Sequence, residues 1–255
     1  PILRDRRWYF GSVQVDDRVD SIPCDADQLP GLCPHPARRR FGVLYLGKLT
    51  FQATPTHKLQ FWTQGEQTGI DNLTQQPTTA PEAERHQDQS TQIYSTAWEW
   101  VPAKSVFLKT QASYQRQRLE VYPQSGDFGT PGFVADSETG IASRNYTRIT
   151  DDVRHRVALN QTLSLFLDRI ALPMEPRVGY RFNYAWNPVS EAVPGDTTFR
   201  TANGDIEAGT RTTWCKSFDG TLDRDDPDRC IEGANKSTTS GLFGSAFAED
   251  TLKFN

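Results

Sequence analysis

The chain has 255 residues and a formal net charge of −4, and 36% of its residues are hydrophobic. It is not strongly basic, which excludes a nucleic-acid footprint, and no segment approaches the about 20 apolar residues of a transmembrane helix. A β-barrel is not excluded, because its strands need apolar residues only at alternate positions.

Eight β-type stretches follow one another along the chain. The first lies in the aromatic-rich segment Pro1–Gln14, and the second, at 38–53, alternates most clearly. One face of the second stretch bears Phe41, Val43, Tyr45, Leu49 and Phe51. The other face bears Gly42, Lys48, Thr50 and Gln52. A period of two separates an apolar from a polar face, and a lysine suits a wet barrel interior better than a dry sandwich core.

The third, fourth and fifth stretches continue the pattern. The third runs from Lys58 to about Glu66, the fourth covers about 91–101, and the fifth runs from Val106 to about Val121. Trp98 and Trp100 share a face of the fourth stretch. The fifth exceeds the about 9–11 residues that span a bilayer. Its polar end therefore predicts a strand that extends beyond the membrane into water.

The last three stretches lie at about 149–165, between 174 and 187, and at about 241–254. Apolar residues of the first two include Val157, Leu159, Val178, Tyr180, Phe182, Tyr184 and Trp186. The opposite faces include Arg154, Arg156, Asn160, Arg177, Arg181 and Asn183. Arginines on the inward face favour a polar interior.

The connections between these stretches alternate between long and short. The long connections are expected at 18–37, 67–90, 122–147 and 188–240, and the short ones at 54–57, 102–104 and 166–173. This asymmetry is typical of outer-membrane barrels, which have short periplasmic turns and long extracellular loops. The predicted fold is all-β: about eight strands of an antiparallel transmembrane β-barrel.

Four cysteines form two local pairs, Cys24 with Cys33 and Cys215 with Cys230, both in long loops. An even number in local pairs predicts two disulfides formed in an oxidising compartment. A zinc site is the alternative, but neither pair is CxxC and only His35 lies near a cysteine.

An acidic run at 219–228 holds five carboxylates within ten residues. Such a run can bind Ca²⁺, but the spacing is not that of an EF-hand, and a solvated loop bounded by Cys215 and Cys230 is the other interpretation. Trp214 and Phe218 in the same loop are candidates for ligand contact only because they are bulky and expected to be exposed. Ligand-binding residues therefore stay unknown.

No catalytic or metal motif emerges. His35, His57, His86 and His155 are scattered, and Glu99 beside two tryptophans lacks a defined partner carboxylate of the kind that a glycosidase requires. Sequons begin at Asn72, Asn145, Asn160 and Asn235; in a Thr-rich sequence we interpret them as chance matches. We predict no enzyme activity, metal or cofactor.

Three segments resemble a known family. PILRDRRWYFGSVQ (Pro1–Gln14) resembles the segment after the plug domain in TonB-dependent outer-membrane receptors, particularly the Oar-like group. GLFGSAFAEDTLKFN (Gly241–Asn255) is similar to that family's aromatic–x–x–Asp strand. YLGKLTFQATPTHKLQF (Tyr45–Phe61) resembles one of its hairpins.

The resemblance implies a transporter in the bacterial outer membrane that captures a scarce extracellular ligand (a siderophore, cofactor, glycan or peptide). Its partners would be outer-membrane lipid and, through a plug, an inner-membrane TonB-type energy-coupling complex. Such receptors have about 22 strands and a plugged lumen. We expect residues 1–255 to be the first part of the barrel domain, without the plug.

Two other hypotheses fit the alternation. A small complete barrel of eight strands would act in adhesion or as a structural membrane protein. A secreted β-sandwich would bind carbohydrate through exposed tryptophans. A longer parent gene with a plug upstream would favour the transporter, and a short parent gene would favour the small barrel. Solubility without detergent would favour the sandwich.

Overall fold

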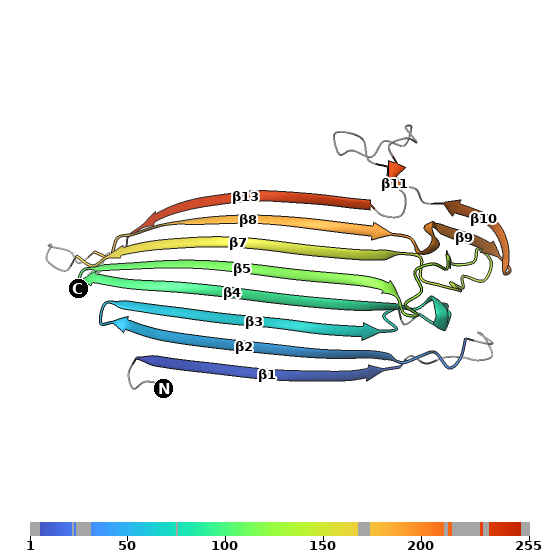
Figure 1. The fold of residues 1–255 in the computed structure, drawn as a ribbon, viewed down its shortest axis with the longest axis horizontal. Coiled ribbons are helices and arrows are strands. Elements are labelled where there is room, and N and C mark those ends of the chain that lie inside the picture. Colours follow the sequence, from blue (N-terminus) through green and yellow to red (C-terminus); the bar gives the residue numbers. More distant parts are fainter. Residues whose placement is uncertain are drawn as a thin grey trace.

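The computed structural model describes residues 6–21, 23, 32–74, 76–167, 174–211, 214–215, 230–231 and 235–250. Eight long strands form one sheet (Figure 1). They are β1 (Arg7–Asp20), β2 (Arg38–Thr54), β3 (His57–Asp71), β4 (Arg85–Ala103), β5 (Val106–Pro123), β7 (Ile149–Leu165), β8 (Arg177–Ala192) and β13 (Asn235–Glu249). Each pairs antiparallel with the next in chain order. The all-β antiparallel fold is therefore confirmed.

Two tight turns lie at one end of the sheet, one between β2 and β3 and one between β4 and β5. Between β2 and β3, the Thr54 hydroxyl oxygen accepts hydrogen bonds from the backbone N–H of Thr56 at 3.3 Å and of His57 at 3.1 Å. Pro55 has no N–H to donate to a ladder. The Thr54 hydroxyl thus provides an acceptor for backbone N–H groups at the point where the strand pairing ends. The chain reverses direction within two residues.

The opposite end of the sheet carries the long connections, which build a second region. We call residues 32–37, 72–84 except 75, 124–148 and 193–211 the loop cap. It contains a three-stranded sheet of β6 (Gly132–Phe133), β9 (Thr197–Ala202) and β10 (Asp205–Arg211), ordered β10-β9-β6. β9 and β10 lie beyond the end of the large sheet, at the right in Figure 1. The remaining pair is β11 (Trp214–Cys215) with β12 (Cys230–Ile231).

The two helical segments are single 3₁₀ turns, η1 (Pro81–Ala83) and η2 (Pro194–Asp196). No helix in the described ranges has the length and apolar character needed to cross a bilayer.

Several strands are longer than the sequence pattern predicts. The connection expected at 67–90 spans only 72–84, the one expected at 188–240 spans 193–234, and the last strand is Asn235–Glu249 instead of 241–254. Near the cap the strands are polar on both faces, so the alternation fades there. The backbone ladder continues regardless, since its hydrogen bonds do not depend on side-chain polarity.

The large sheet has two open edges among the described residues, because β1 pairs only with β2 and β13 only with β8. Large side chains at these edges are exposed, among them Tyr9, Phe10, Leu242 and Phe243. Unpaired edges of this length are templates for further strands. The sheet therefore has the form of a segment of a larger β-structure.

Candidate functional site

Cross-strand register divides the large sheet into two faces. One row of partners runs Tyr9, Leu49, Phe61, Thr96, Ala112, Leu159, Phe182 and Gly244. We call the face that bears this row the apolar face. The adjacent row runs Phe10, Lys48, Trp62, Ser95, Ser113, Ala158, Asn183 and Phe243. We call its face the polar face. The assignment of residues to faces agrees with the sequence-based alternation.

Large side chains on the apolar face are more exposed than several side chains on the polar face. Leu49 and Phe61 on the apolar face are 44% and 43% exposed, whereas Ser95 and Asn183 on the polar face are 0% and 9% exposed. Side chains crowd together on the concave side of a curved sheet and spread apart on its convex side. The polar face is therefore the concave one, and the large apolar side chains point outward.

Aromatic clusters lie on the apolar face at two heights. Near the tight turns, the rings of His57, Trp98 and Trp100 stack with centroids 5.8 Å apart. Toward the loop cap, His155 stacks on Trp186 at 4.6 Å and on Tyr114 at 6.1 Å.

The separation of the two clusters follows from the register. Trp100 pairs with Leu108, and His155 pairs with Arg116 on the same strand β5. At about 3.3 Å per residue, the rise from Leu108 to Arg116 is about 26 Å. The side chains between these two heights on the apolar face are mainly Leu, Phe, Tyr, Val, Ala and Thr.

The polar face carries paired charges near the tight turns. Glu99 on β4 accepts from Lys58 Nζ at 3.1 Å and lies 3.5 Å from Lys109 Nζ. Gln60 donates to the same carboxylate at 3.3 Å. The register places all four side chains on the polar face. Glu99 is therefore a counter-ion for two lysines.

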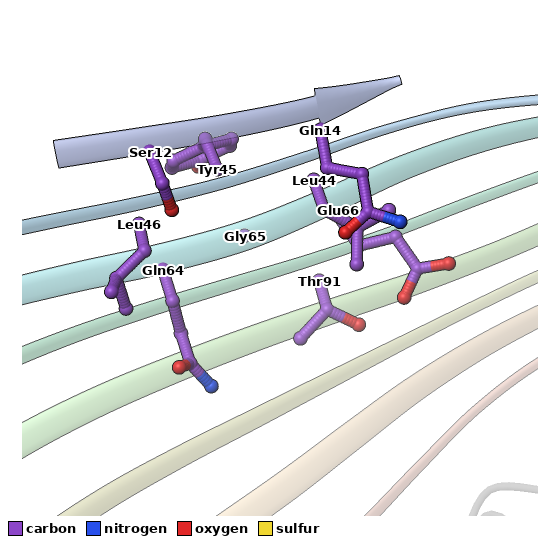
Figure 2. A pocket seen from close by; sticks show the side chains of 9 residues that line it. All are labelled: Ser12, Gln14, Leu44, Tyr45, Leu46, Gln64, Gly65, Glu66 and Thr91. Atoms are coloured by element: carbon purple, nitrogen blue, oxygen red, sulfur yellow. The ribbon is translucent and has the colours of Figure 1, made fainter. Parts of the chain in front are cut away.

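A shallow cavity of about 350 Å³ lies against β1–β4 (Figure 2). Its lining residues are Ser12, Gln14, Leu44, Tyr45, Leu46, Gln64, Gly65, Glu66 and Thr91. Most belong to the polar face and present hydroxyl, amide or carboxylate groups. Gly65 faces Tyr45 on the neighbouring strand, and a Cβ at this glycine would collide with the tyrosine ring.

A buried contact between a histidine and a glutamate joins two connections of the loop cap. His35 Nε2 lies 3.3 Å from Glu84 Oε1 and 3.0 Å from the Thr79 carbonyl oxygen, and both ionisable side chains are fully buried. The other Glu84 oxygen accepts the backbone N–H of Thr74 at 3.0 Å. The first and second long connections are thereby joined. These buried polar groups resist separation, because a buried polar group left without a hydrogen-bond partner is costly.

Asp136 joins the third and fourth connections. Its Oδ2 accepts the N–H of Gly204 at 2.9 Å, and its Oδ1 accepts the N–H groups of Thr139 at 3.0 Å and Asn203 at 3.2 Å. These bonds, led by the one from Gly204, hold the pKa of the Asp136 carboxyl well below its ordinary value, because they stabilise the charged form. Asn203 and Gly204 have φ of 50° and 87° and form the two-residue turn between β9 and β10.

The structure describes three of the four cysteines for which disulfides are predicted. The described residues include no free cysteine, and Cys33 is disulfide-bonded. Cys24 lies outside the described residues, so its pairing with Cys33 stays a prediction. Cys215 and Cys230 are directly opposite each other in the β11–β12 pair, and the bond between them stays a prediction too.

The other residues that the sequence singled out are dispersed. The acidic run 219–228 and Phe218 lie outside the described residues, and so does any calcium site there. No group of three metal-ligating side chains occurs in the described part of the chain. Asn72 and Asn145 are engaged inside the cap, where their amide N–H groups donate to backbone carbonyls. Asn160 accepts a bond from Arg181 on the polar face.

Comparison with known proteins gives one informative result. No protein-family model matches the chain, and no curated protein matches it in sequence. Among solved structures, the outer membrane transporter YddB from Escherichia coli is similar, with a TM-score of 0.56 and 9% identity. The large sheet therefore has the fold of a segment of an antiparallel β-barrel. The match covers 98% of this chain and 33% of that one, so this chain spans about a third of the structure it matches.

Proposed function

We propose that this chain is part of the wall of a β-barrel transporter in the bacterial outer membrane. The observation that carries the proposal is the outward apolar face bounded by two aromatic clusters. Their outermost rings lie about 26 Å apart along the strands, and a strand tilt of about 35–45° reduces this to about 20 Å along the barrel axis, which is comparable with the apolar band of about 25 Å between the aromatic girdles of outer-membrane barrels. The likeness to an outer membrane transporter adds support.

The exposure of the apolar face argues against a sandwich. In a β-sandwich this face would pack on a second sheet about 10 Å away. Here Leu49, Phe61 and Phe182 are 44%, 43% and 41% exposed. Exposing such side chains to water costs about 25 cal/mol per Å², whereas lipid removes the cost. Lipid is therefore the environment that suits this face, and outer-membrane lipid is the first partner we propose.

The polar face and loop cap suit a transport role. A concave wall with amide, hydroxyl and paired charged groups can line an aqueous interior, and the cap stands where extracellular loops would meet an arriving ligand. By the resemblance of its hairpin at Tyr45–Phe61 and its terminal segments, we propose uptake of the TonB-dependent type. The ligand would be scarce (a siderophore, cofactor, glycan or peptide), and an inner-membrane TonB-type complex would supply energy through a plug.

Fractionation of the native cell envelope tests the coarser proposal. We expect the parent protein in the outer membrane, soluble only in detergent, with a gel band well above the 28.8 kDa of this chain that shifts on heating. A heat-modifiable band near that mass would favour a small complete barrel. A detergent-free soluble protein would refute the membrane assignment and favour the sandwich.

A second experiment tests energy coupling. We expect cells that lack the inner-membrane coupling complex to retain binding of the cognate ligand at the surface but to lose its accumulation. Accumulation that persists without the complex would leave the barrel assignment intact and refute TonB dependence.

A further inference from the structure

Two arginines in the middle of the polar face have no carboxylate partner among the described residues. They are Arg156 on β7 and Arg181 on β8. The other polar-face arginines of the same two strands do have one: Arg154 pairs with Asp152 at 2.7 Å, and Arg177 pairs with Glu249 at 3.0 Å. The positive charge of Arg156 and Arg181 is thus uncompensated in the structure, which contrasts with that of their neighbours.

Asparagines orient both guanidinium groups. Arg156 donates from Nε and Nη2 to Asn183 Oδ1 at 3.3 and 2.9 Å, and Arg181 donates from Nε to Asn160 Oδ1 at 3.1 Å. An amide oxygen fixes the direction of the fork but carries no net charge. A guanidinium has five N–H donors, so each arginine keeps several N–H groups for another acceptor.

The two arginines line one cavity of about 230 Å³. The other lining residues are Ile93, Ser113, Gln115, Ala158, Asn160 and Asn183. No acidic residue is among them. Ala158 and Asn183, each 9% exposed, pair across the two strands. Arg156 lies two positions from Ala158 on β7, and Arg181 lies two positions from Asn183 on β8, so the two cations flank this small pair from opposite sides.

We propose that this cavity is a binding site for an oxyanion, a carboxylate or a phosphate, held between Arg156 and Arg181. Arginine forks bind these groups through charge-assisted, often bidentate, hydrogen bonds. The oxyanion comes either from a transported ligand or from an acidic side chain of another segment of the same protein. The proposal relies on the proposed function only in taking the polar face as the inner wall of the barrel.

Citrate binding to the full-length protein that contains this chain, purified in detergent, tests the site. At constant ionic strength set with sodium chloride, citrate should raise the melting temperature in a saturable way. The double variant Arg156→Gln/Arg181→Gln should bind citrate at least about tenfold more weakly, because charge-assisted bonds are among the strong ones. The matched control Arg154→Gln/Arg177→Gln removes two compensated arginines and should keep wild-type affinity.

A second variant keeps both arginines and changes only their partners. Asn160→Asp/Asn183→Asp gives each arginine an internal counter-ion, as Arg154 and Arg177 already have. It should lose the citrate response while the protein still folds, which separates loss of the site from loss of structure.

The outcomes also identify the source of the oxyanion. A citrate response confined to proteins with Arg156 and Arg181 intact supports a ligand group. No citrate response, together with a lower melting temperature in Arg156→Gln/Arg181→Gln than in the control double variant, supports an internal carboxylate that already fills the site. Equal citrate responses in all variants, or no response with equal melting temperatures, would overturn the site. Citrate binding is measured without transport. If the proposed uptake function fails its own test, the citrate result still tests the oxyanion site.

Discussion

The loop cap buries large side chains, both apolar and polar, whereas the middle of the large sheet buries only small or polar ones. In the cap, Leu32 and Phe133 are buried, and the buried charges of Glu84 and Asp136 are satisfied by hydrogen bonds. In the sheet, the buried residues of the strands' central parts are small or polar, and large apolar residues such as Phe61 are exposed. The cap therefore buries large apolar side chains as a protein in water does, whereas the sheet leaves its large apolar side chains exposed. This difference fits the proposed placement of the chain, with water around the cap and lipid around the sheet.

The largest effect should come from removing the cap's aromatic core. Phe133 is 5% exposed and packs edge-on against Phe199 with ring centroids 5.4 Å apart. We expect Phe133→Ala to lower the free energy of unfolding of the cap by about 3–5 kcal/mol, as is usual for a buried Phe truncation. Hydrogen exchange of cap amides measures it, and Phe128→Ala, at a 52% exposed position, is the control with little effect.

The same hydrogen-exchange experiment can refute the division of the molecule into a sheet and a cap. If the sheet amides lose as much protection as the cap amides, the two regions unfold as one unit and their separation as distinct structures is wrong.

The next effect should distinguish the two faces of a single strand. Phe61 lies midway between the two aromatic clusters on the apolar face, and Gln64 lies on the polar face of the same strand. We expect Phe61→Arg to cost about 2–4 kcal/mol in lipid, the range for arginine at the bilayer midplane. Gln64→Arg should cost much less. Equilibrium unfolding in phospholipid vesicles measures both, and equal costs would contradict the assignment of faces.

A smaller effect should depend on pH and be confined to the cap. Because the folded pKa of Asp136 is lowered, its stabilising contribution is full above about pH 4, the ordinary value for aspartate. It is lost as the pH falls toward the folded pKa. We expect the protection factors of the Gly204 and Thr139 amides to drop by about tenfold or more between pH 5 and pH 2.

The variant Asp136→Asn is the control for this titration. Its cap should be less protected at pH 5 and should vary less with pH. An unchanged pH profile in the variant would mean that other groups govern the cap.

The smallest effect concerns one cross-strand contact on the apolar face. The Tyr45 ring covers Gly65 on the neighbouring strand. Cross-strand pairs of this kind contribute about 0.2–1 kcal/mol, so Tyr45→Ala should lower the free energy of unfolding by that amount. Tyr45→Phe, which keeps the ring, should be near neutral. A loss above about 2 kcal/mol would mean that this face is a packed protein core, where truncations cost about 2–5 kcal/mol.

The faces of the sheet could be predicted from sequence because a period of two needs no tertiary information. Leu159 and Asn160, or Phe182 and Asn183, differ in polarity and therefore in face. The strand ends could not be placed, since the strands beside the cap, around Thr68 and Gln89, are polar on both sides. There the backbone ladder alone sets the boundary.

The cap was largely beyond sequence reasoning. The contact of His35 with Glu84 joins two separate connections, and no local pattern indicates it. Asn203-Gly204 does carry a sequence signal, because Asn-Gly is the preferred pair for a two-residue hairpin turn with positive φ. Arg156 and Arg181 were recognised as inward-facing, but only the structure shows that asparagines and not carboxylates orient them.

The most direct test of the central claim is collision accessibility of single spin labels at positions 59 to 64 of β3, in the full-length protein reconstituted into lipid. We predict that labels at 59, 61 and 63 collide with oxygen, which partitions into lipid, and that labels at 60, 62 and 64 collide with a water-soluble nickel chelate. Labels at 59, 61 and 63 that neither reagent reaches would place the apolar face inside a protein core and contradict the account.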